Sequence, residues 1–407
     1  MSLSQLYRAV EKPVQAGELA GAVGLVWRRG ATEAVTAGWR DLESQLPVER
    51  DTIFRIASMT KPITSVAALM LVEEGRIALD EPIARIAPEF TQMRVLRSPN
   101  GPLDETDAAS RPITFDDLLT HRAGFTYASF HRGPISQAYR GALGDEIDSE
   151  RTPDEWIANL ARLPLIGQPG SAMYYGCSTD LLGFLIGRIE SVPLGVLLEQ
   201  RIFGPLGMKD TGFFVPPDKR HRAAAAYGFD ENGKLVKLMS RPGAFVERRP
   251  ENMAFESGSG GLCSTADDYL KFARLFLGDG KVDGVHFLRS EMLARMMTNQ
   301  LSDVQRANSV LLGQKPFAVG RGFGLGVSVV LETNSADFMR RGSPGTVSWP
   351  GAFGGWWEAD PSAGSVSIFL AHTMVDLAQM ARGIGLGVWA AIDDFQGAAM
   401  ALESASA

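Results

Sequence analysis

Ser58-Met59-Thr60-Lys61 places a hydroxyl and an amine three residues apart at the predicted start of a helix. Apolar residues follow at helical spacing, and Gly75 is a suitable C-terminal stop; these residues are Ile63, Val66, Ala67, Met70 and Leu71. Because residues three apart share one helix face, we expect Lys61 to lie one turn from Ser58. A serine hydroxyl needs a nearby base to become a nucleophile, and an amine at this spacing can serve. From these four residues alone, a helix N-terminus with a solvated lysine is the simpler interpretation, so the rest of the chain decides.

The composition is that of an ordinary globular chain. It has 407 residues, of which 45% are hydrophobic and 21% are charged. This length allows one large core or two lobes that share it. The net charge of −7 argues against nucleic acid or an anionic membrane as a partner. We therefore expect neither nucleic acid nor a membrane as a partner, while the oligomeric state stays open.

The cysteines and the N-terminus favour a cytoplasmic location. The two cysteines, Cys177 and Cys263, are too few for a disulfide framework. The first residues lack a basic stretch followed by an apolar one, as a signal peptide would have. The apolar run from Leu19 to Trp27 is too short to span a bilayer.

Strand patterns occur at both ends of the chain, and helical patterns lie between them. Near the N-terminus we expect a helix at 3–16, a hairpin of strands at 21–28 and 34–39, and a short strand at Phe54. Between about 80 and 240 we expect mainly helices, including 181–190, with long loops at 91–110 and 130–150. Late strands are expected at 323–331, 345–349, 356–359 and 365–371, followed by a helix at 377–398.

This order predicts an α+β fold. An antiparallel sheet built from both chain ends is flanked by helices, and a mainly helical domain is inserted into it. We assign residues 1–80 plus 245–407 to the sheet domain and residues 81–244 to the helical domain.

Several other chemistries lack their motifs. None of the five histidines stands in a nucleophile context, and Gly176-Cys177-Ser178-Thr179-Asp180 fails the Gly-x-Ser-x-Gly pattern at its last position. No His-x-x-x-His pair is present, so we expect no metal. The segment Gly258-Ser259-Gly260-Gly261 lacks the lysine of a phosphate loop, and a turn that lets backbones approach closely is the better interpretation. We expect no cofactor.

Two further segments have the chemistry that a Ser58–Lys61 pair would need. Tyr175 follows a turn and precedes an apolar helix, so it is either a packing residue or a second base. Tyrosine and lysine are poor bases at neutral pH, but a neighbouring ammonium and phenol assist one another. The run from Trp349 to Gly355 lies between strands, where glycines allow a backbone N–H to approach a reacting carbonyl oxygen. A tight β-turn explains that run equally well.

Five segments, taken together and in their order along the chain, are more specific than any one of them. They are Phe54-Arg55-Ile56-Ala57-Ser58-Met59-Thr60-Lys61, Leu118-Leu119-Thr120-His121-Arg122-Ala123-Gly124, Tyr175-Gly176-Cys177-Ser178-Thr179-Asp180-Leu181-Leu182-Gly183, Ile202-Phe203-Gly204-Pro205-Leu206-Gly207-Met208-Lys209-Asp210-Thr211 and Gly260-Gly261-Leu262-Cys263-Ser264-Thr265-Ala266-Asp267-Asp268-Tyr269. With these segments the chain resembles the serine β-lactamase-like family of the class C type, and within it the family VIII carboxylesterases. The likeness covers most of the chain. It implies a β-lactamase or penicillin-binding-protein-like fold.

The resemblance implies roles for particular residues. Ser58 would be the acylated nucleophile, and Lys61 and Tyr175 would share the base and acid roles. The backbone amides of Ser58 and Ala352 would form the oxyanion hole. The substrate-binding residues would be Trp349, Gly351, Cys177 and Tyr127.

Two departures from the β-lactamase pattern narrow the expected substrate. Cys177 stands where β-lactamases have an asparagine, and a thiol is a weak partner for a substrate amide. Trp349 stands where they have a lysine that can attract a carboxylate. Both changes fit a neutral, apolar ester, although Arg55, Arg321 or Arg341 could offset them.

We therefore expect a serine carboxylesterase without a cofactor, acting on short-chain esters and weakly on β-lactams. One alternative is an acyltransferase of the same family, which passes the acyl group to another alcohol. A second is a β-lactamase or D-aminopeptidase. A third is a non-catalytic scaffold on this fold, against which the intact Ser58, Lys61 and Tyr175 argue.

Overall fold

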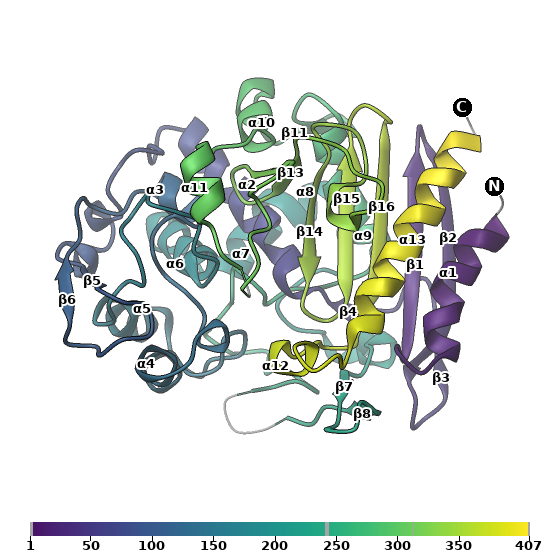
Figure 1. The fold of residues 1–407 in the computed structure, drawn as a ribbon. Coiled ribbons are helices and arrows are strands. Elements are labelled where there is room, and N and C mark those ends of the chain that lie inside the picture. Colours follow the sequence, from purple (N-terminus) through teal and green to yellow (C-terminus); the bar gives the residue numbers. More distant parts are fainter. Residues whose placement is uncertain (1–2, 241–243, 312, 406–407) are drawn as a thin grey trace.

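An eight-stranded antiparallel sheet forms the framework of the molecule (Figure 1). The computed structural model describes residues 3–240, 244–311 and 313–405. The strands, in their order across the sheet, are β12 (Arg321–Phe323), β13 (Ser328–Val330), β14 (Val347–Gly351), β15 (Gly355–Asp360), β16 (Ser365–Ala371), β1 (Gly21–Arg28), β2 (Ala31–Asp41) and β3 (Leu46–Pro47). Strands from the two chain ends meet in the middle, where Leu25 of β1 is paired with Ile368 of β16.

Helices cover both faces of this sheet. On one face, α1 (Leu3–Gln15) and α13 (Leu386–Ala405) lie side by side, and both chain ends come together there (Figure 1). Phe395 of α13 is fully buried against Phe369 of β16. The other face packs against α2 (Thr60–Glu73) and α9 (Ala266–Ala273). The sheet is therefore buried on both sides, which its many buried apolar residues require.

The middle of the chain is mainly helical and continues the core around α2. Its helices are α3 (Phe115–Leu119), α4 (Pro134–Leu143), α5 (Pro153–Ala161), α6 (Ser178–Glu190), α7 (Leu194–Leu198) and α8 (Gly204–Leu206). The remaining helices are α10 (Ser290–Met296), α11 (Asp303–Asn308) and α12 (Leu377–Met380). The two-stranded pieces are β4 (Phe54–Arg55) with β9 (Cys263–Ser264), β5 (Arg94–Leu96) with β6 (Thr106–Ala108), β7 (Tyr227–Phe229) with β8 (Leu235–Lys237), and β10 (Lys281–Val282) with β11 (Val285–His286).

Helix α2 is buried all around because it lies between the sheet and the helical part. Its contact with α6 adds a second packed face to the one that the apolar spacing predicts. Polar residues such as Lys61 and Thr64 are therefore buried as well. Thr64 satisfies its hydroxyl by donating to the carbonyl oxygen of Gly258 at 2.7 Å. Burial of a polar side chain on this helix is favourable only where the protein supplies such a partner.

The predicted α+β class is confirmed, and most of the predicted elements occur. The strand at 21–28, the strand at 365–371 and the first helix agree within one residue. The sheet is antiparallel and is built from both chain ends, as expected. The division into residues 1–80 plus 245–407 and residues 81–244 stays a prediction.

Four local predictions are wrong. The expected strand at 323–331 is a hairpin, β12 and β13, because the chain reverses at Gly324 to Gly326. Gly326 has a φ of +94°, and a Cβ there would lie 2.1 Å from the Ser65 hydroxyl oxygen. The expected helix at 377–398 is two helices, interrupted by Gly383 and Gly385 with φ of +85° and +79°. The expected loops at 91–110 and 130–150 contain the β5–β6 hairpin and α4.

The longest apolar helices belong to the protein core. Within the described residues, no single helix has the length and apolar character needed to cross a membrane. One bent pair, Ser178–Glu190 with Leu194–Leu206, passes that test when taken together. Its first helix, α6, packs against α2.

The packing of α13 on the sheet predicts a strong dependence of stability on Phe395. Replacing Phe395 by alanine should lower the free energy of unfolding by about 3–5 kcal/mol, because it leaves a cavity in the buried layer between α13 and the sheet. Urea denaturation would measure this change. The matched control is Leu386→Ala on the same helix, where the side chain is 49% exposed. That change should stay within about 0.5 kcal/mol, and equal losses in the two variants would contradict the prediction.

Candidate active site

Ser58 lies in a strained turn between β4 and α2. The turn is a single 3-10 stretch, Ala57–Met59, and Ala57 has a φ of +44°, which costs about 1–3 kcal/mol for a residue with a Cβ. Two contacts keep the turn in place. The amide of Ile56 donates to the carbonyl oxygen of Leu262 at 3.0 Å, and the Tyr269 hydroxyl donates to that of Met59 at 2.9 Å. The Ser58 side chain remains half-buried, so it can be reached from solvent.

Lys61 connects Ser58 to two other segments of the chain. Its Nζ donates to the Ser58 Oγ at 3.2 Å, to the Tyr127 hydroxyl at 3.2 Å and to the carbonyl oxygen of Ser259 at 2.9 Å. The side chain is only 1% exposed. Three acceptors for three N–H groups satisfy a buried ammonium completely. The predicted neighbourhood of Ser58 and Lys61 is thus present in the structure.

A chain of hydrogen bonds leads from Lys61 into the protein. The Tyr127 hydroxyl lies 2.7 Å from the Ser259 Oγ, which in turn lies 2.6 Å from Oδ2 of Asp180. Oδ1 of Asp180 accepts from the Ser257 hydroxyl at 2.6 Å and from the Ser259 amide at 3.1 Å. Burial raises the pKa of Tyr127 well above its ordinary value, so its hydroxyl stays protonated.

Tyr175 approaches Lys61 with its ring rather than with its hydroxyl. The Lys61 Nζ lies 4.6 Å from the centre of the Tyr175 ring, a cation–π contact. The Tyr175 hydroxyl accepts a hydrogen bond from Nε1 of Trp349 at 3.1 Å. Because the indole donates to it, the hydroxyl keeps its own proton available for another acceptor.

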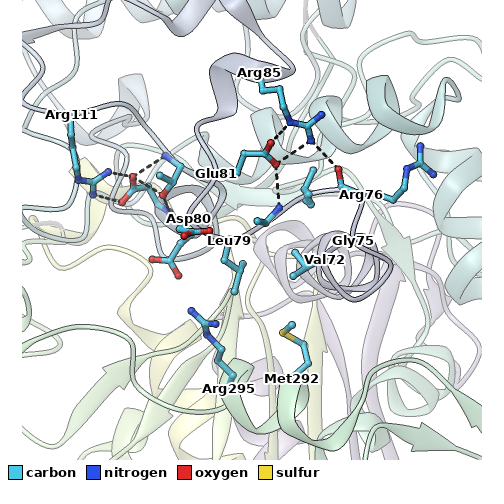
Figure 2. Close-up of a pocket in the computed structure, with 15 residues that line it drawn as sticks. Val72, Gly75, Arg76, Leu79, Asp80, Glu81, Arg85, Arg111, Met292 and Arg295 are labelled. Atoms are coloured by element: carbon cyan, nitrogen blue, oxygen red, sulfur yellow. Dashed lines mark hydrogen bonds and ion pairs between the residues drawn. The ribbon is translucent and has the colours of Figure 1, made fainter.

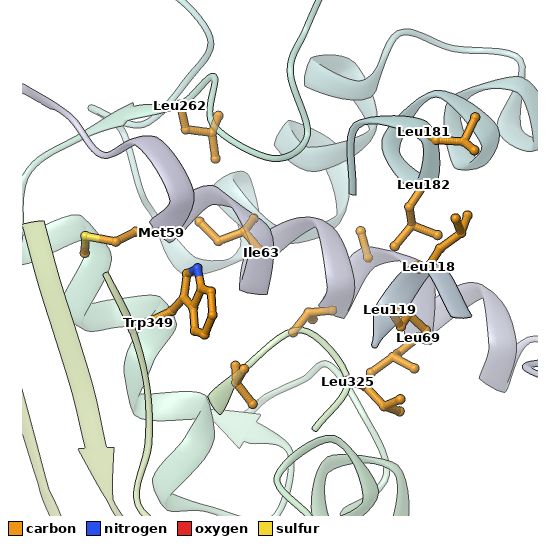
Figure 3. Close-up of a cluster of buried hydrophobic side chains, with 14 of the residues drawn as sticks. Met59, Ile63, Leu69, Leu118, Leu119, Leu181, Leu182, Leu262, Leu325 and Trp349 are labelled. Carbon is orange, nitrogen blue, oxygen red and sulfur yellow. The ribbon is translucent and has the colours of Figure 1, made fainter. Parts of the chain in front are cut away.

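Trp349 is buried next to Tyr175 and contacts it. It is 2% exposed and packs near Met59 and Ile63 at the start of α2 (Figure 3). Its ring centre is 5.3 Å from that of Tyr175 and 5.2 Å from that of Phe323. The indole therefore holds Tyr175 in place, and Tyr175 contacts both Trp349 and Lys61.

An aromatic wall flanks the nucleophile on the helical side. Phe130 is half-buried and stacks on Tyr175, with ring centres 5.8 Å apart and an angle of 21° between the ring planes. Phe130 also meets Tyr127 edge to face at 5.6 Å. His121 is buried behind Tyr175, with ring centres 4.9 Å apart. Burial, helped by the nearby Lys61, holds the pKa of His121 well below its ordinary value, so this wall carries no charge.

The end of β14 comes close to the nucleophile turn because Gly351 has no side chain. A Cβ on Gly351 would lie 2.5 Å from the carbonyl oxygen of Ile56. The next residue, Ala352, begins the turn to β15, and its carbonyl oxygen accepts from the Val375 amide at 3.2 Å. This approach brings the end of β14 to the segment that leads into the Ser58 turn, while an oxyanion hole of the Ser58 and Ala352 amides stays a prediction.

A buried ion-pair cluster holds the segment before α5 against the site. Asp148 accepts from Nη1 of Arg55 at 3.1 Å and from Nε of Arg249 at 2.7 Å. Arg55 also donates to the carbonyl oxygen of Phe245, and Arg249 donates to those of Phe213 and Gly261. Asp148 is 3% exposed. The cluster connects Arg55, which precedes the nucleophile turn, to four other segments, at residues 148, 213, 245–249 and 261.

Cys177 contributes a neutral, buried group. The thiol is free, and its residue is 3% exposed. Burial raises its pKa well above the ordinary value, mainly because no water solvates the thiolate. A neutral thiol neither attracts a substrate charge nor gives the strong hydrogen bonds of an amide.

A charged groove of about 1190 Å³ lies at the other end of α2 (Figure 2). Its walls carry ion pairs such as Arg111 with Asp117, at 2.6 Å, and Arg85 with Glu81. Ser58 and Lys61 are not among the residues that line it. The groove is therefore separate from the nucleophile.

The structure brings some of the expected site residues together and adds others. Ser58 and Lys61 lie together, and Trp349 and Tyr175 are in direct contact. The hydroxyl of Tyr127, which was expected to bind substrate, accepts a hydrogen bond from Lys61. No role was expected for Ser259 or Asp180, although both lie in segments quoted above, because their partners are distant in the sequence. Asp180 belongs to the same quoted segment as Tyr175 and lies five residues beyond it, a signal that could have pointed to it.

A serine hydrogen-bonded to a lysine at the start of a buried helix, beside an antiparallel sheet, is the arrangement of proteins that form acyl-enzymes on serine. The family model described as Beta-lactamase matches residues 6–386, and the chain belongs to this family.

Similar proteins span nearly the same length. An uncharacterised protein of Mycobacterium tuberculosis is 44% identical over 379 residues, which cover 93% of this chain and 92% of that protein. Esterase EstB of Burkholderia gladioli is 31% identical over 384 residues, covering 91% and 90%. The solved structure of EstCE1, "a hydrolase with promiscuous acyltransferase activity", has a TM-score of 0.77 at 24% identity and covers 96% of this chain and 97% of that chain.

The close approach of β14 predicts that Gly351 controls the reactivity of Ser58. The change Gly351→Ala should slow the labelling of Ser58 by a fluorophosphonate about 10–100-fold, because the added Cβ displaces the Ala352 amide from the nucleophile turn. Mass spectrometry of the intact protein over time would measure this rate. Gly141→Ala on α4 is the matched control, since a Cβ there meets nothing within 4 Å. A natively folded Gly351→Ala variant that labels at the normal rate would refute the assignment.

Proposed function

We propose that this protein is a serine carboxylesterase that hydrolyses short-chain, neutral esters through an acyl-enzyme on Ser58. The observation that carries the proposal is the 3.2 Å hydrogen bond between Lys61 Nζ and Ser58 Oγ, in a site whose adjacent wall is aromatic and uncharged. The serine is exposed enough to meet a substrate, and the lysine is fully enclosed.

The reaction begins with the amine form of Lys61. The O–H bond of Ser58 breaks as a new N–H bond forms on Lys61, and Oγ attacks the ester carbonyl carbon. The amides of Ser58 and Ala352 donate to the oxyanion. When the bond to the leaving alcohol breaks, that oxygen takes the proton from Lys61. Water then attacks the acyl-enzyme with Lys61 again as base, and the acid is released as Oγ regains its proton.

The two tyrosines have different parts in this proposal. Tyr127 accepts a hydrogen bond from Lys61 and stabilises its ammonium form. Tyr175 has the Trp349 indole as a donor, so its own O–H can donate a hydrogen bond to the leaving-alcohol oxygen while that oxygen takes the proton from Lys61. Tyr175 thus assists Lys61 in the acid role, while Tyr127 stays behind the base.

The surroundings favour a neutral substrate over one with a carboxylate. Arg55 is engaged by Asp148 and the Phe245 carbonyl, and Arg341 is held by Asp393 at 2.7 Å. Arg321 is buried over the ring of Phe317, with burial lowering its pKa to about 10. Arg55 and Arg341 are thus committed elsewhere, and neither replaces the lysine that Trp349 displaces. These contacts support an ester over a penicillin-like substrate.

The similar proteins support the same activity. EstB is named an esterase, and EstCE1 is named a hydrolase. We propose that the chain is a family VIII carboxylesterase, and these names support that proposal. We further propose that it acts in the cytoplasm on a small-molecule ester, and that neither nucleic acid nor a membrane is its partner.

An acyltransferase is the second candidate, because EstCE1 is described as having promiscuous acyltransferase activity. The site chemistry is the same, and only the acceptor differs. Adding methanol or a longer alcohol during hydrolysis of p-nitrophenyl butyrate would separate the two candidates. An esterase releases mainly butyric acid, whereas an acyltransferase forms mainly the new ester. Nitrocefin turnover faster than ester turnover would instead point to a β-lactamase.

Replacing Ser58 should abolish esterase activity. We expect Ser58→Ala to lower kcat on p-nitrophenyl butyrate by at least about 10⁴-fold, because no acyl-enzyme can form. Ser65→Ala is the matched control: it lies on the same buried helix, its hydroxyl has no partner in the described part of the chain, and it should keep normal activity. Full activity of Ser58→Ala would disprove the proposal. Failure of Ser58 to form any phosphonate adduct would favour a scaffold protein.

A further inference from the structure

We infer that Asp180 is a positioning residue for the Lys61 base, acting through Ser259 and Tyr127. This inference deepens the proposed function and rests on it for the reaction, but its test reads the reactivity of Ser58 directly. The hydrogen-bonded series runs from Asp180 to Ser259 at 2.6 Å, to Tyr127 at 2.7 Å and to Lys61 at 3.2 Å.

Asp180 has the contacts of an ionised carboxylate. The Ser259 amide can only donate, and it points at Oδ1 at 3.1 Å. The hydroxyls of Ser257 and Ser259 lie 2.6 Å from the two carboxylate oxygens, which is typical of an O–H donating to a charged oxygen. Burial raises the pKa of Asp180, while these serine hydroxyls and Lys61 oppose that rise. Asp180 is 1% exposed, and no ion pair to it occurs among the described residues.

An ionised Asp180 sets the direction of every bond in the series. Ser259 has one hydroxyl proton and gives it to Asp180, so its oxygen must accept from Tyr127. Tyr127 then has no proton left for Lys61, and its oxygen accepts from the Lys61 ammonium. The carbonyl oxygen of Ser259 supplies a second fixed acceptor at 2.9 Å. Two N–H groups are thus held in place, and the third points at Ser58.

This arrangement strengthens Lys61 as a base. When Lys61 takes the proton of Ser58, the new ammonium finds oriented acceptors and a buried negative charge behind them. An asparagine at position 180 would remove the charge and could donate to Ser259. Ser259 could then donate to Tyr127, and Tyr127 to the Lys61 amine, which reverses the series. The amine would be favoured over the ammonium, so proton abstraction from Ser58 would be weaker.

Other titratable groups near Asp180 do not explain a change in the neutral range. The groups that face it or its partners are Lys61, Tyr127, Cys177, Glu146, Tyr139, Tyr175 and His121. Burial keeps the pKa of His121 well below its ordinary value and those of Tyr127, Tyr139 and Cys177 well above theirs. Glu146, whose pKa is raised mainly by burial, is the remaining carboxylate and requires its own control.

The test compares the pH dependence of Ser58 reactivity in the wild type and in Asp180→Asn. Two rates are followed: labelling by a fluorophosphonate and kcat/KM on p-nitrophenyl butyrate. We expect the plateau to fall about 10–100-fold. We also expect the midpoint of the acid limb to move down by about one pH unit, because loss of the carboxylate disfavours the ammonium. A purely structural defect would lower the plateau and leave the midpoint unchanged.

Matched variants keep the result interpretable. Glu358→Gln removes another buried carboxylate, on the opposite face of the sheet, and Glu146→Gln removes the other one near the site; both should retain the midpoint. Ser259→Ala should lower the plateau and shift the midpoint downward as Asp180→Asn does, but by a smaller amount. If Asp180→Asn does not fold, Ser259→Ala tests the inference in its place. In the double variant, the loss should not exceed that of Asp180→Asn, because the two act in one series.

An unchanged or raised midpoint in natively folded Asp180→Asn, or additive losses in the double variant, would overturn the inference. A wild type that labels Ser58 but hydrolyses no ester would refute the esterase function alone, since labelling still reports the base.

Discussion

The enclosure of Lys61 is the constraint on which the site depends. An ammonium removed from water must find acceptors for all of its N–H groups, or it would be strongly destabilised. Here the acceptors come from three separate segments: Ser58 before α2, Tyr127 after α3, and Ser259 before β9. One cation therefore aligns the nucleophile turn, the helical part and the glycine-rich turn. Its chemistry and its structural role cannot be separated.

The sheet provides the second half of the geometry. Sequence-distant strands meet so that the end of β14 lies against the strained turn of Ser58, which only glycine at position 351 permits. The strain at Ala57 is held by the surrounding core, since the turn is bonded to Leu262 and Tyr269. The nucleophile is thus placed by packing on both sides, while its own side chain remains accessible.

Charge is concentrated behind the nucleophile and absent from the adjacent wall. Asp180 and Lys61 are both enclosed, whereas the adjacent wall is a neutral aromatic stack of half-buried Phe130 on Tyr175, with Trp349 buried behind Tyr175. Such a surface offers a substrate dispersion contacts and little electrostatic selection.

The sequence by itself determined the antiparallel sheet from both chain ends, the helix after Ser58 and the Ser58–Lys61 pair. These features follow from local periodicity and from spacing within one helical turn. Only the tertiary structure decided that the hydroxyl of Tyr127, rather than that of Tyr175, accepts a hydrogen bond from Lys61. It also decided that Ser259 and Asp180 continue this series of hydrogen bonds. The chain breaks at Gly324–Gly326 and at Gly383 and Gly385 were likewise seen only in the structure. The hydrogen bonds of the site join residues far apart in the chain, and no local pattern records which distant side chain will be the partner.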